Sequence, residues 1–239
     1  MFDSNMLEIL SELAILFPAL LVIFTSRGFF KSLAAKIVGD DTAYENGFLT
    51  LNPLIHIDVI GLIIMLTIVF FVGGLLSGYV PIYFLFIFVI LLGARWVIPV
   101  PINEHNFKNY SLGVLITTIA GPLGCFLTSL FFLYIAAYFP INLVPKYVSS
   151  SVLIVIRTII EFSLFFGVLD LIPIPPFDGG RLLRVVLPLK FHGVVDWLER
   201  YSLFIFLTIF FLPGLRNYFF GIIYLIAFFI KQFLMSLVF

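Results

Sequence analysis

Charged residues are scarce in this sequence of 239 residues. Only 11% of the chain is Asp, Glu, Lys or Arg, whereas 62% is hydrophobic, and the mean hydropathy is +1.21. Soluble domains carry about a quarter charged residues, so this composition excludes an ordinary soluble domain. The 13 basic residues balance the 13 acidic ones. The chain therefore lacks the basic excess of a nucleic-acid-binding protein, and we expect no nucleic-acid partner.

Cysteine and histidine are equally rare. The single Cys125 excludes an intrachain disulfide. The only histidines are His56, His105 and His192, so the first 55 residues contain none. Because the imidazole is the commonest metal-binding side chain, the N-terminal segment cannot contribute a histidine-based metal site.

Long apolar runs make up most of the sequence. Their hydrophobic residues are continuous rather than alternating, which favours helices over strands. We expect an all-α polytopic membrane protein, with residues 1–239 forming a single domain surrounded by lipid. About six runs are long enough to cross a bilayer. The expected crossings are residues 7–25 with a more polar extension to Val38, then 57–76, 82–98, 112–139, 152–169, and a final stretch 201–239. Pro213-Gly214 divides that last stretch into two short spans or a re-entrant pair, and a short amphipathic piece at 185–200 precedes it.

The distribution of basic residues predicts the orientation, because cytoplasmic loops carry an excess of Lys and Arg. One side of the predicted bundle collects most of the cations, and the other side has Lys146 and Arg216. We therefore expect the N-terminus outside and the polar loops on the cytoplasmic side of a cell membrane. The cytoplasmic cations are Arg27, Lys31, Lys36, Arg95, Lys108, Arg181, Arg184, Lys190 and Arg200.

An unusual loop follows the fifth predicted crossing, over residues 170–181. Pro173 and Pro175 remove backbone donors and fix an extended backbone, and Gly179-Gly180 permits a tight turn or a helix start. Irregular backbone at membrane depth survives only inside protein or around water, so this loop aims Asp178 at the helix bundle. The alternative is an interfacial proline turn in which Asp178 only caps a helix.

This loop resembles the Asn-x-x-Pro-x-Pro-x-x-Asp-Gly motif of the site-2 proteases, which are intramembrane zinc metalloproteases. Three more blocks resemble that family in the same order, so the resemblance spans about Arg27 to Tyr201, and it is closest to the compact prokaryotic branch. It implies a compact helical core, with a small β-hairpin in the Phe48–Asn52 region. The three blocks are Gly39–Ala43 leading to Leu49–Asp58, which holds Asn52, Pro53, His56 and Asp58; Pro99–Asn109; and Ala120-Gly121-Pro122.

The family's zinc-binding motif is degenerate in this chain. The resemblance implies a His-Glu-x-x-His helix with two zinc ligands and a glutamate base, and a third ligand from the later aspartate. Aligned back from Gly39, these positions hold Arg27, Gly28 and Lys31. Arginine cannot lose its proton to bind zinc, and glycine has no basic side chain. Of the three ligands only Asp178 remains, so we expect no metal and no catalytic residue.

The substitutions keep the net charge of the site. The family's zinc, glutamate and aspartate sum to zero, and so do Arg27, Lys31, Asp170 and Asp178. We hypothesise that the two cations replace the metal and pair with the two aspartates across the bundle, because an unpaired charge is costly inside a membrane. The alternative is that Arg27 and Lys31 only reach the cytoplasmic headgroups.

Other polar residues are weaker candidates. His56, His105 and Asp178 could form an unanticipated metal site, although a lone histidine usually serves only as a hydrogen-bonding residue. Glu8 and Glu12 face Arg157 and Glu161 as potential partners, but Arg157 and Glu161 are four residues apart and are expected to pair within one helix.

A preserved scaffold with a lost metal site indicates a pseudoprotease. Such a protein would bind or shield transmembrane-helix clients, or pair with an active protease homologue. The alternative from the enzyme class is a divergent active metalloprotease that binds zinc through other ligands. A small transporter or channel is a further alternative, although the sequence has no inverted repeat of the kind that many transporters contain.

Overall fold

A computed structural model describes residues 4–58, 60–61, 63–64, 67, 97–138, 146–175 and 177–239, without the side chains of 4–9 and 146–149. The described residues are almost entirely helical. The longer helices are α1 (Ser4–Val38), α6 (Tyr110–Tyr138), α7 (Lys146–Asp170), α8 (Asp178–Val186), α9 (His192–Phe211) and α10 (Pro213–Val238). Short helices are α2 (Thr42–Glu45), α3 (Pro53–His56), η1 (Glu104–Asn106) and η3 (Leu189–Phe191).

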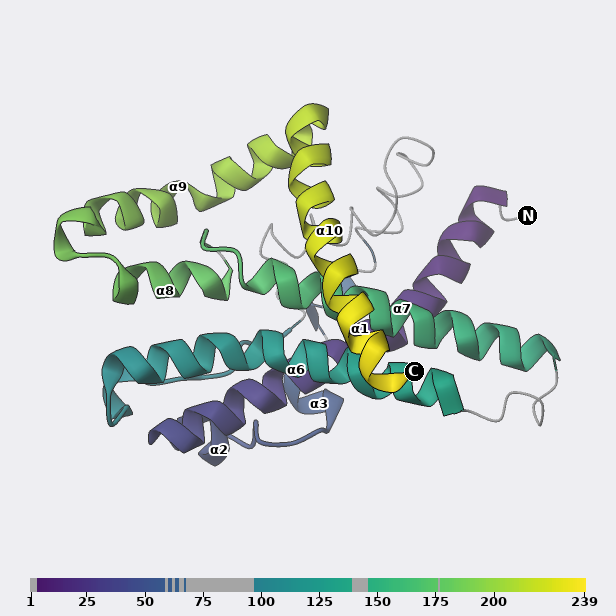
Figure 1. Cartoon of the computed structure of the whole chain (residues 1–239), viewed down its shortest axis with the longest axis horizontal. Coiled ribbons are helices and arrows are strands. Elements are labelled where there is room, and N and C mark those ends of the chain that lie inside the picture. Colours follow the sequence, from purple (N-terminus) through teal and green to yellow (C-terminus); the bar gives the residue numbers. More distant parts are fainter. Residues whose placement is uncertain are drawn as a thin grey trace.

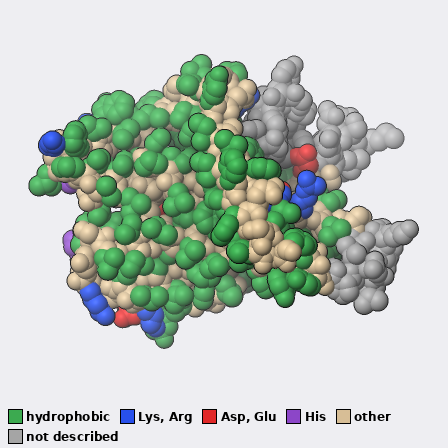
Figure 2. Space-filling model, viewed as in Figure 1, with side chains coloured by type: hydrophobic (Ala, Val, Ile, Leu, Met, Phe, Trp, Pro, Cys, Tyr) green, Lys and Arg blue, Asp and Glu red, His purple; other side chains and the backbone are tan. Residues whose placement is uncertain are grey.

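Three long helices, α1, α6 and α7, pack against one another and form the centre of the bundle (Figure 1). Their shared core is built from large apolar side chains, including Leu20, Ile23 and Leu164, which are almost fully buried. Because these helices lie side by side, α1 brings Arg27 and Lys31 next to the loop that follows α7. Hydrophobic side chains cover most of the face in Figure 2, as expected for a surface in contact with lipid.

Four helices are long and apolar enough to cross a membrane, which confirms an all-α membrane protein within the described residues. They are Leu10–Val38, Tyr110–Tyr138, Ser150–Asp170 and Pro213–Val238. The predicted crossings at 57–76 and 82–98 lie mostly outside the described residues, so the expectation of about six crossings stays a prediction.

The expected amphipathic piece at 185–200 is wrong as a single element. Helix α8 ends at Val186, and α9 begins only at His192 and continues to Phe211. Pro188 separates them, because proline cannot donate the helical hydrogen bond and disfavours a helical residue before it. The expected break at Pro213-Gly214 is present between α9 and α10, and α10 is the long apolar helix of the pair.

The predicted β-hairpin in the Phe48–Asn52 region is also wrong. These residues form bends and extended backbone without strands, and Asn52 accepts a hydrogen bond from the backbone of Leu54 as the cap of α3. The extended pairing falls later, in an antiparallel bridge between Ile57 and Val97. The backbone amide of Ile98 donates to the carbonyl of His56 at 2.8 Å in the same pairing.

Candidate functional site

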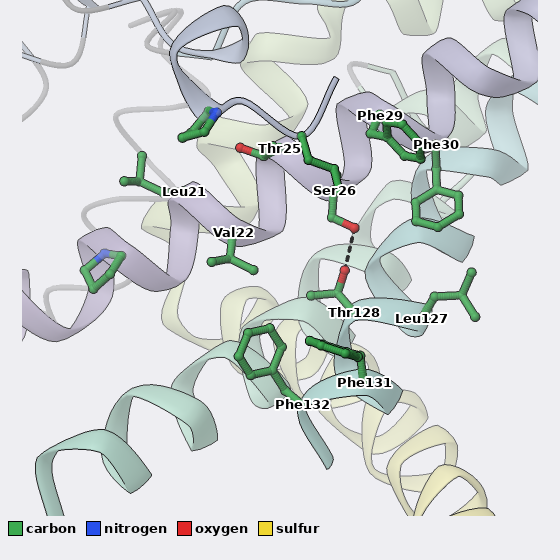
Figure 3. Close-up of a pocket in the computed structure, with 13 residues that line it drawn as sticks. Leu21, Val22, Thr25, Ser26, Phe29, Phe30, Leu127, Thr128, Phe131 and Phe132 are labelled. Atoms are coloured by element: carbon green, nitrogen blue, oxygen red, sulfur yellow. Dashed lines mark hydrogen bonds between the residues drawn. The ribbon is translucent and has the colours of Figure 1, made fainter. Parts of the chain in front are cut away.

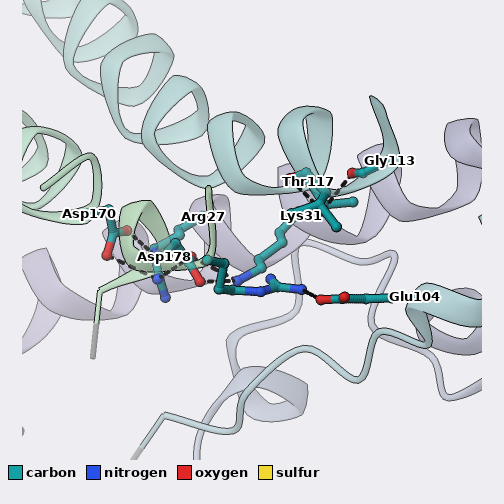
Figure 4. A network of polar contacts seen from close by, with 9 residues as sticks. Arg27, Lys31, Glu104, Gly113, Thr117, Asp170 and Asp178 are labelled. Atoms are coloured by element: carbon teal, nitrogen blue, oxygen red, sulfur yellow. Dashed lines mark hydrogen bonds and ion pairs between the residues drawn. The ribbon is translucent and has the colours of Figure 1, made fainter. Parts of the chain in front are cut away.

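Four charged side chains from three segments meet at the end of α7 (Figure 4). The Arg27 guanidinium on α1 donates to both oxygens of Asp170, and its Nη2 lies 2.9 Å from Asp178 Oδ2. Lys31, one turn further along α1, places its Nζ 2.7 Å from both Asp178 oxygens. Each side chain is mostly buried. The two cations and two carboxylates therefore form one closed, neutral ion-pair network.

Two glycines hold Asp178 in this position at the start of α8. A Cβ atom at Gly179 would lie 2.5 Å from the carbonyl oxygens of Leu171 and Ile172, and one at Gly180 would lie 2.6 Å from the nitrogen of Pro175. Real side chains do not tolerate such contacts with backbone atoms. The first turn of α8 can therefore pack onto the proline loop only because both residues are glycine, and that packing directs Asp178 at α1.

The network controls the ionisation of Asp178, which lies outside the membrane-spanning helices. Burial alone would raise the pKa of this carboxyl. The positive charges of Lys31 and Arg27, together with the hydrogen bond from Lys31, outweigh burial and lower its pKa from 3.8 to about 2. Asp178 is therefore a carboxylate at neutral pH, committed to the two cations.

Gly28, which the resemblance aligns with the family's glutamate, lies against His56. A Cβ at Gly28 would lie 2.4 Å from His56 Nδ1 and 2.7 Å from Cε1. The ring is almost fully buried, its Nε2 lies 2.9 Å from the Thr50 carbonyl oxygen, and its edge meets Phe48. Nδ1 has no hydrogen-bond partner among the residues that the structure describes. The imidazole thus occupies space that a side chain at position 28 would need.

The remaining candidate residues serve the loops around this centre. Asp58 Oδ1 accepts from the amide of Ile60 at 3.0 Å. His105 is exposed in η1, where its amide donates to Asn103. Neither the Asp58 nor the His105 side chain joins the network. Pro53 begins α3, and Pro173 and Pro175 lie in the loop before α8.

Asp40 is a structural residue that the sequence reading did not single out. Its buried carboxylate accepts from the amide of Asn103 at 2.8 Å and from the Asn106 side chain at 2.9 Å. It also accepts from the amide and hydroxyl of Thr42. These bonds lower the pKa of Asp40 although burial opposes the shift. Asp40 therefore ties the loop after α1 to the loop before α6.

The residues present do not fit the zinc ion that the family resemblance implies. Arginine and lysine offer only donors, where zinc would need lone pairs, and both hold Asp178 within hydrogen-bonding distance. His56 binds the Thr50 carbonyl through Nε2, and its Nδ1 lies against the backbone at Gly28, which has no side chain to share a metal. Within the described residues, no group of three His, Cys, Asp or Glu side chains converges as a metal site.

A largely apolar pocket of about 640 Å³ lies between α1 and α6 and reaches the segment at Leu51 and Pro53 (Figure 3). Its few polar atoms include the hydroxyls of Ser26 and Thr128, which are 2.6 Å apart. Residues 22, 25 and 29 line the pocket, and their helical spacing places them on one face of α1. Arg27 and Lys31 lie on a different face. The sequence reading missed it, since a cavity depends on how two helices pack.

The expected pair of Arg157 and Glu161 within α7 is wrong. Glu161 instead accepts from Lys231 of α10. Lys231 lies 70 positions from Glu161 in the sequence. The i,i+4 spacing within one helix could not predict a partner on another helix. Likewise, the ion pair of Arg181 with Glu104, which adjoins the network, had no sequence signal.

Comparison with curated proteins gives one informative relative. The chain is similar to "Putative zinc metalloprotease YwhC" of Bacillus subtilis (strain 168). The two are 27% identical over 207 residues, which cover 85% of this chain and 83% of that protein. No protein-family model matches the chain, and no solved structure matches it significantly. The similarity supports a site-2-protease-like relationship, in agreement with the four sequence blocks.

Proposed function

We propose that this chain is a non-catalytic relative of intramembrane zinc metalloproteases, which binds or shields transmembrane-helix clients, or pairs with an active homologue, without cutting them. The observation that carries the proposal is the contact between Lys31 and Asp178. The Lys31 ammonium group holds Asp178 at 2.7 Å. The resemblance aligns Asp178 with the third zinc ligand and Lys31 with a zinc-binding histidine. The similarity to the protein described as a zinc metalloprotease supplies the family context.

The proposed client surface is the pocket between α1 and α6. Its wall is made of aliphatic and aromatic side chains such as Leu21, Phe29, Leu127 and Phe131, which suit the apolar surface of a membrane helix. The hydroxyl of Thr25 is buried there without a hydrogen-bond partner in the described part of the chain. It could hydrogen-bond a small polar group on a client, as Ser and Thr do between membrane helices.

The cell membrane and the orientation belong to the same proposal. We place the ion-pair network and the loops around it on the cytoplasmic side, with the N-terminus outside, because the cations gather at that end of the helices. Client helices would then bind the pocket, which lies on a different face of α1 from the network.

The test combines cleavage and crosslinking in reconstituted vesicles with a single-span model substrate. A photoreactive residue at Phe131, in the pocket, should crosslink the substrate, while the same residue at the equally exposed Phe204 of α9 should not. The substrate should stay intact with and without a chelator. Chelator-sensitive cleavage would refute the non-catalytic role. Equal crosslinking from the two positions would refute the pocket as the client surface.

The competing function is a divergent active metalloprotease. The name of the similar Bacillus subtilis protein, "Putative zinc metalloprotease YwhC", favours it. It would require Asp178 to leave its two cations before a metal could bind. Gly28 cannot supply a base, and the two carboxylates of the network, Asp170 and Asp178, are held by Arg27 and Lys31. We therefore favour the non-catalytic role.

A further inference from the structure

An ion pair joins α7 to α10 within the membrane-spanning part of both helices. Glu161 lies near the middle of the span Ser150–Asp170, and Lys231 lies in the span Pro213–Val238. The pair is not fully buried, because the Glu161 side chain is 43% exposed and the Lys231 side chain is 25% exposed. Polar groups that face hydrocarbon are unfavourable. This exposure therefore indicates that something other than lipid tails covers the pair.

The pair borders a groove of about 430 Å³ between the two helices. The walls include Gly221, Tyr224, Leu225 and Phe228 of α10. A Cβ atom at Gly221 would meet nothing within 4 Å, so this wall is low and open. Small residues of this kind let another membrane helix approach closely. Helix α10 is also the least buried of the four spans, which leaves room for a neighbour.

The charge around the groove is not balanced. Arg157 lies one turn before Glu161 on the same face of α7, and its side chain is exposed. None of the ion pairs between described residues includes Arg157. Arg157, Glu161 and Lys231 therefore carry a net charge of one positive unit at membrane depth. A basic residue there is stabilised by a carboxylate.

We propose that the groove between α7 and α10 binds a transmembrane helix of another protein that carries an Asp or Glu near its middle. The helix packs against Gly221 and Tyr224 in the groove. Its carboxylate approaches Lys231 and pairs with Arg157, which lies beside the groove one turn before Glu161. Lipid headgroups do not serve, because Glu161 lies near mid-span. This groove shares no lining residue with the pocket between α1 and α6, so the inference stands apart from the proposed function.

The test uses the full chain in phosphatidylcholine vesicles and labelled single-span Leu-Ala peptides with a central Asp, Lys or Leu. Energy transfer between protein and peptide measures binding. The Asp peptide should bind about tenfold more tightly than the Leu peptide, as expected for one polar contact between membrane helices. Arg157→Met should abolish the preference and Arg157→Lys should retain it. Arg157→Glu should prefer a peptide with a central Lys, and Lys190→Met, outside the groove, should change nothing.

Three outcomes would overturn the proposal. The three peptides could bind wild-type protein equally. The preference for the Asp peptide could persist in Arg157→Met. Energy transfer between two labelled copies of the chain could be lost in Arg157→Met while peptide binding is unchanged, which would assign the groove to self-association.

Discussion

Nζ of Lys31 lies 2.7 Å from both carboxylate oxygens of Asp178. Within the resemblance to site-2 proteases, these two positions would hold two ligands of one zinc ion. In this chain they bond to each other. Under the proposed function, Lys31 and Arg27, one turn before it on α1, supply the positive charge that the metal would supply in that family.

Removing the charge of Asp178 should destabilise the protein. Asp178→Asn leaves Arg27 and Lys31 with only Asp170, so one buried cation loses its partner, and breaking a buried pair in this way costs about 3–5 kcal/mol. Adding Lys31→Met restores neutrality and should recover most of the loss. Thermal unfolding in detergent measures both effects.

The control for this pair is Asp178→Asn combined with Lys190→Met, which removes an exposed lysine outside the network. That combination should not recover stability. If Lys31→Met and Lys190→Met had the same effect in the Asp178→Asn background, the two cations would only be reaching the lipid headgroups.

The contribution of Asp178 should also depend on pH with a defined sign. Its pKa falls from 3.8 to about 2 on folding, so its stabilising effect is complete above the unfolded value and is lost as pH falls towards the folded one. The difference in unfolding temperature between wild type and Asp178→Asn should therefore be constant from pH 7 to about pH 5 and shrink between pH 4 and pH 2. A difference that already closes between pH 7 and pH 5 would show that the carboxylate is not held by the two cations.

Gly28→Ala should destabilise the protein although alanine favours helices. The new Cβ would lie 2.4 Å from His56 Nδ1, and overpacking of this kind costs about 1–3 kcal/mol. Gly193→Ala in α9 is the matched control, because a Cβ there meets nothing within 4 Å. Thermal unfolding should show a loss for the first variant and none for the second. Equal stability of the two would mean that the His56 ring moves away freely.

A second variant separates the contact from a general effect on α1. In a His56→Ala background, Gly28→Ala should cost less than it does in wild type, since contacting residues give coupled effects. Additive effects would contradict the close packing of Gly28 on His56.

The sequence predicted those parts of the molecule that depend on local pattern. The α1 and α6 helices follow from apolar length, and the break before α10 follows from Pro213. The grouping of Arg27 and Lys31 with two aspartates could be hypothesised because helical spacing places both cations on one face and the charges sum to zero. The structure joins the same four side chains.

Features that depend on distant packing could not be predicted. The bridge between Ile57 and Val97 replaces the expected hairpin because its partner lies far along the chain. Lys231 replaces Arg157 as the partner of Glu161 for the same reason. The contact of Gly28 with His56 required the position of α3 relative to α1.

The zinc content per chain, measured by elemental mass spectrometry on protein purified in detergent without chelator, tests the central claim most directly. We expect zinc near background, with no difference between wild type and Asp178→Asn, because Arg27 and Lys31 occupy the place of two ligands. About one zinc per chain, lost in Asp178→Asn, would contradict the account.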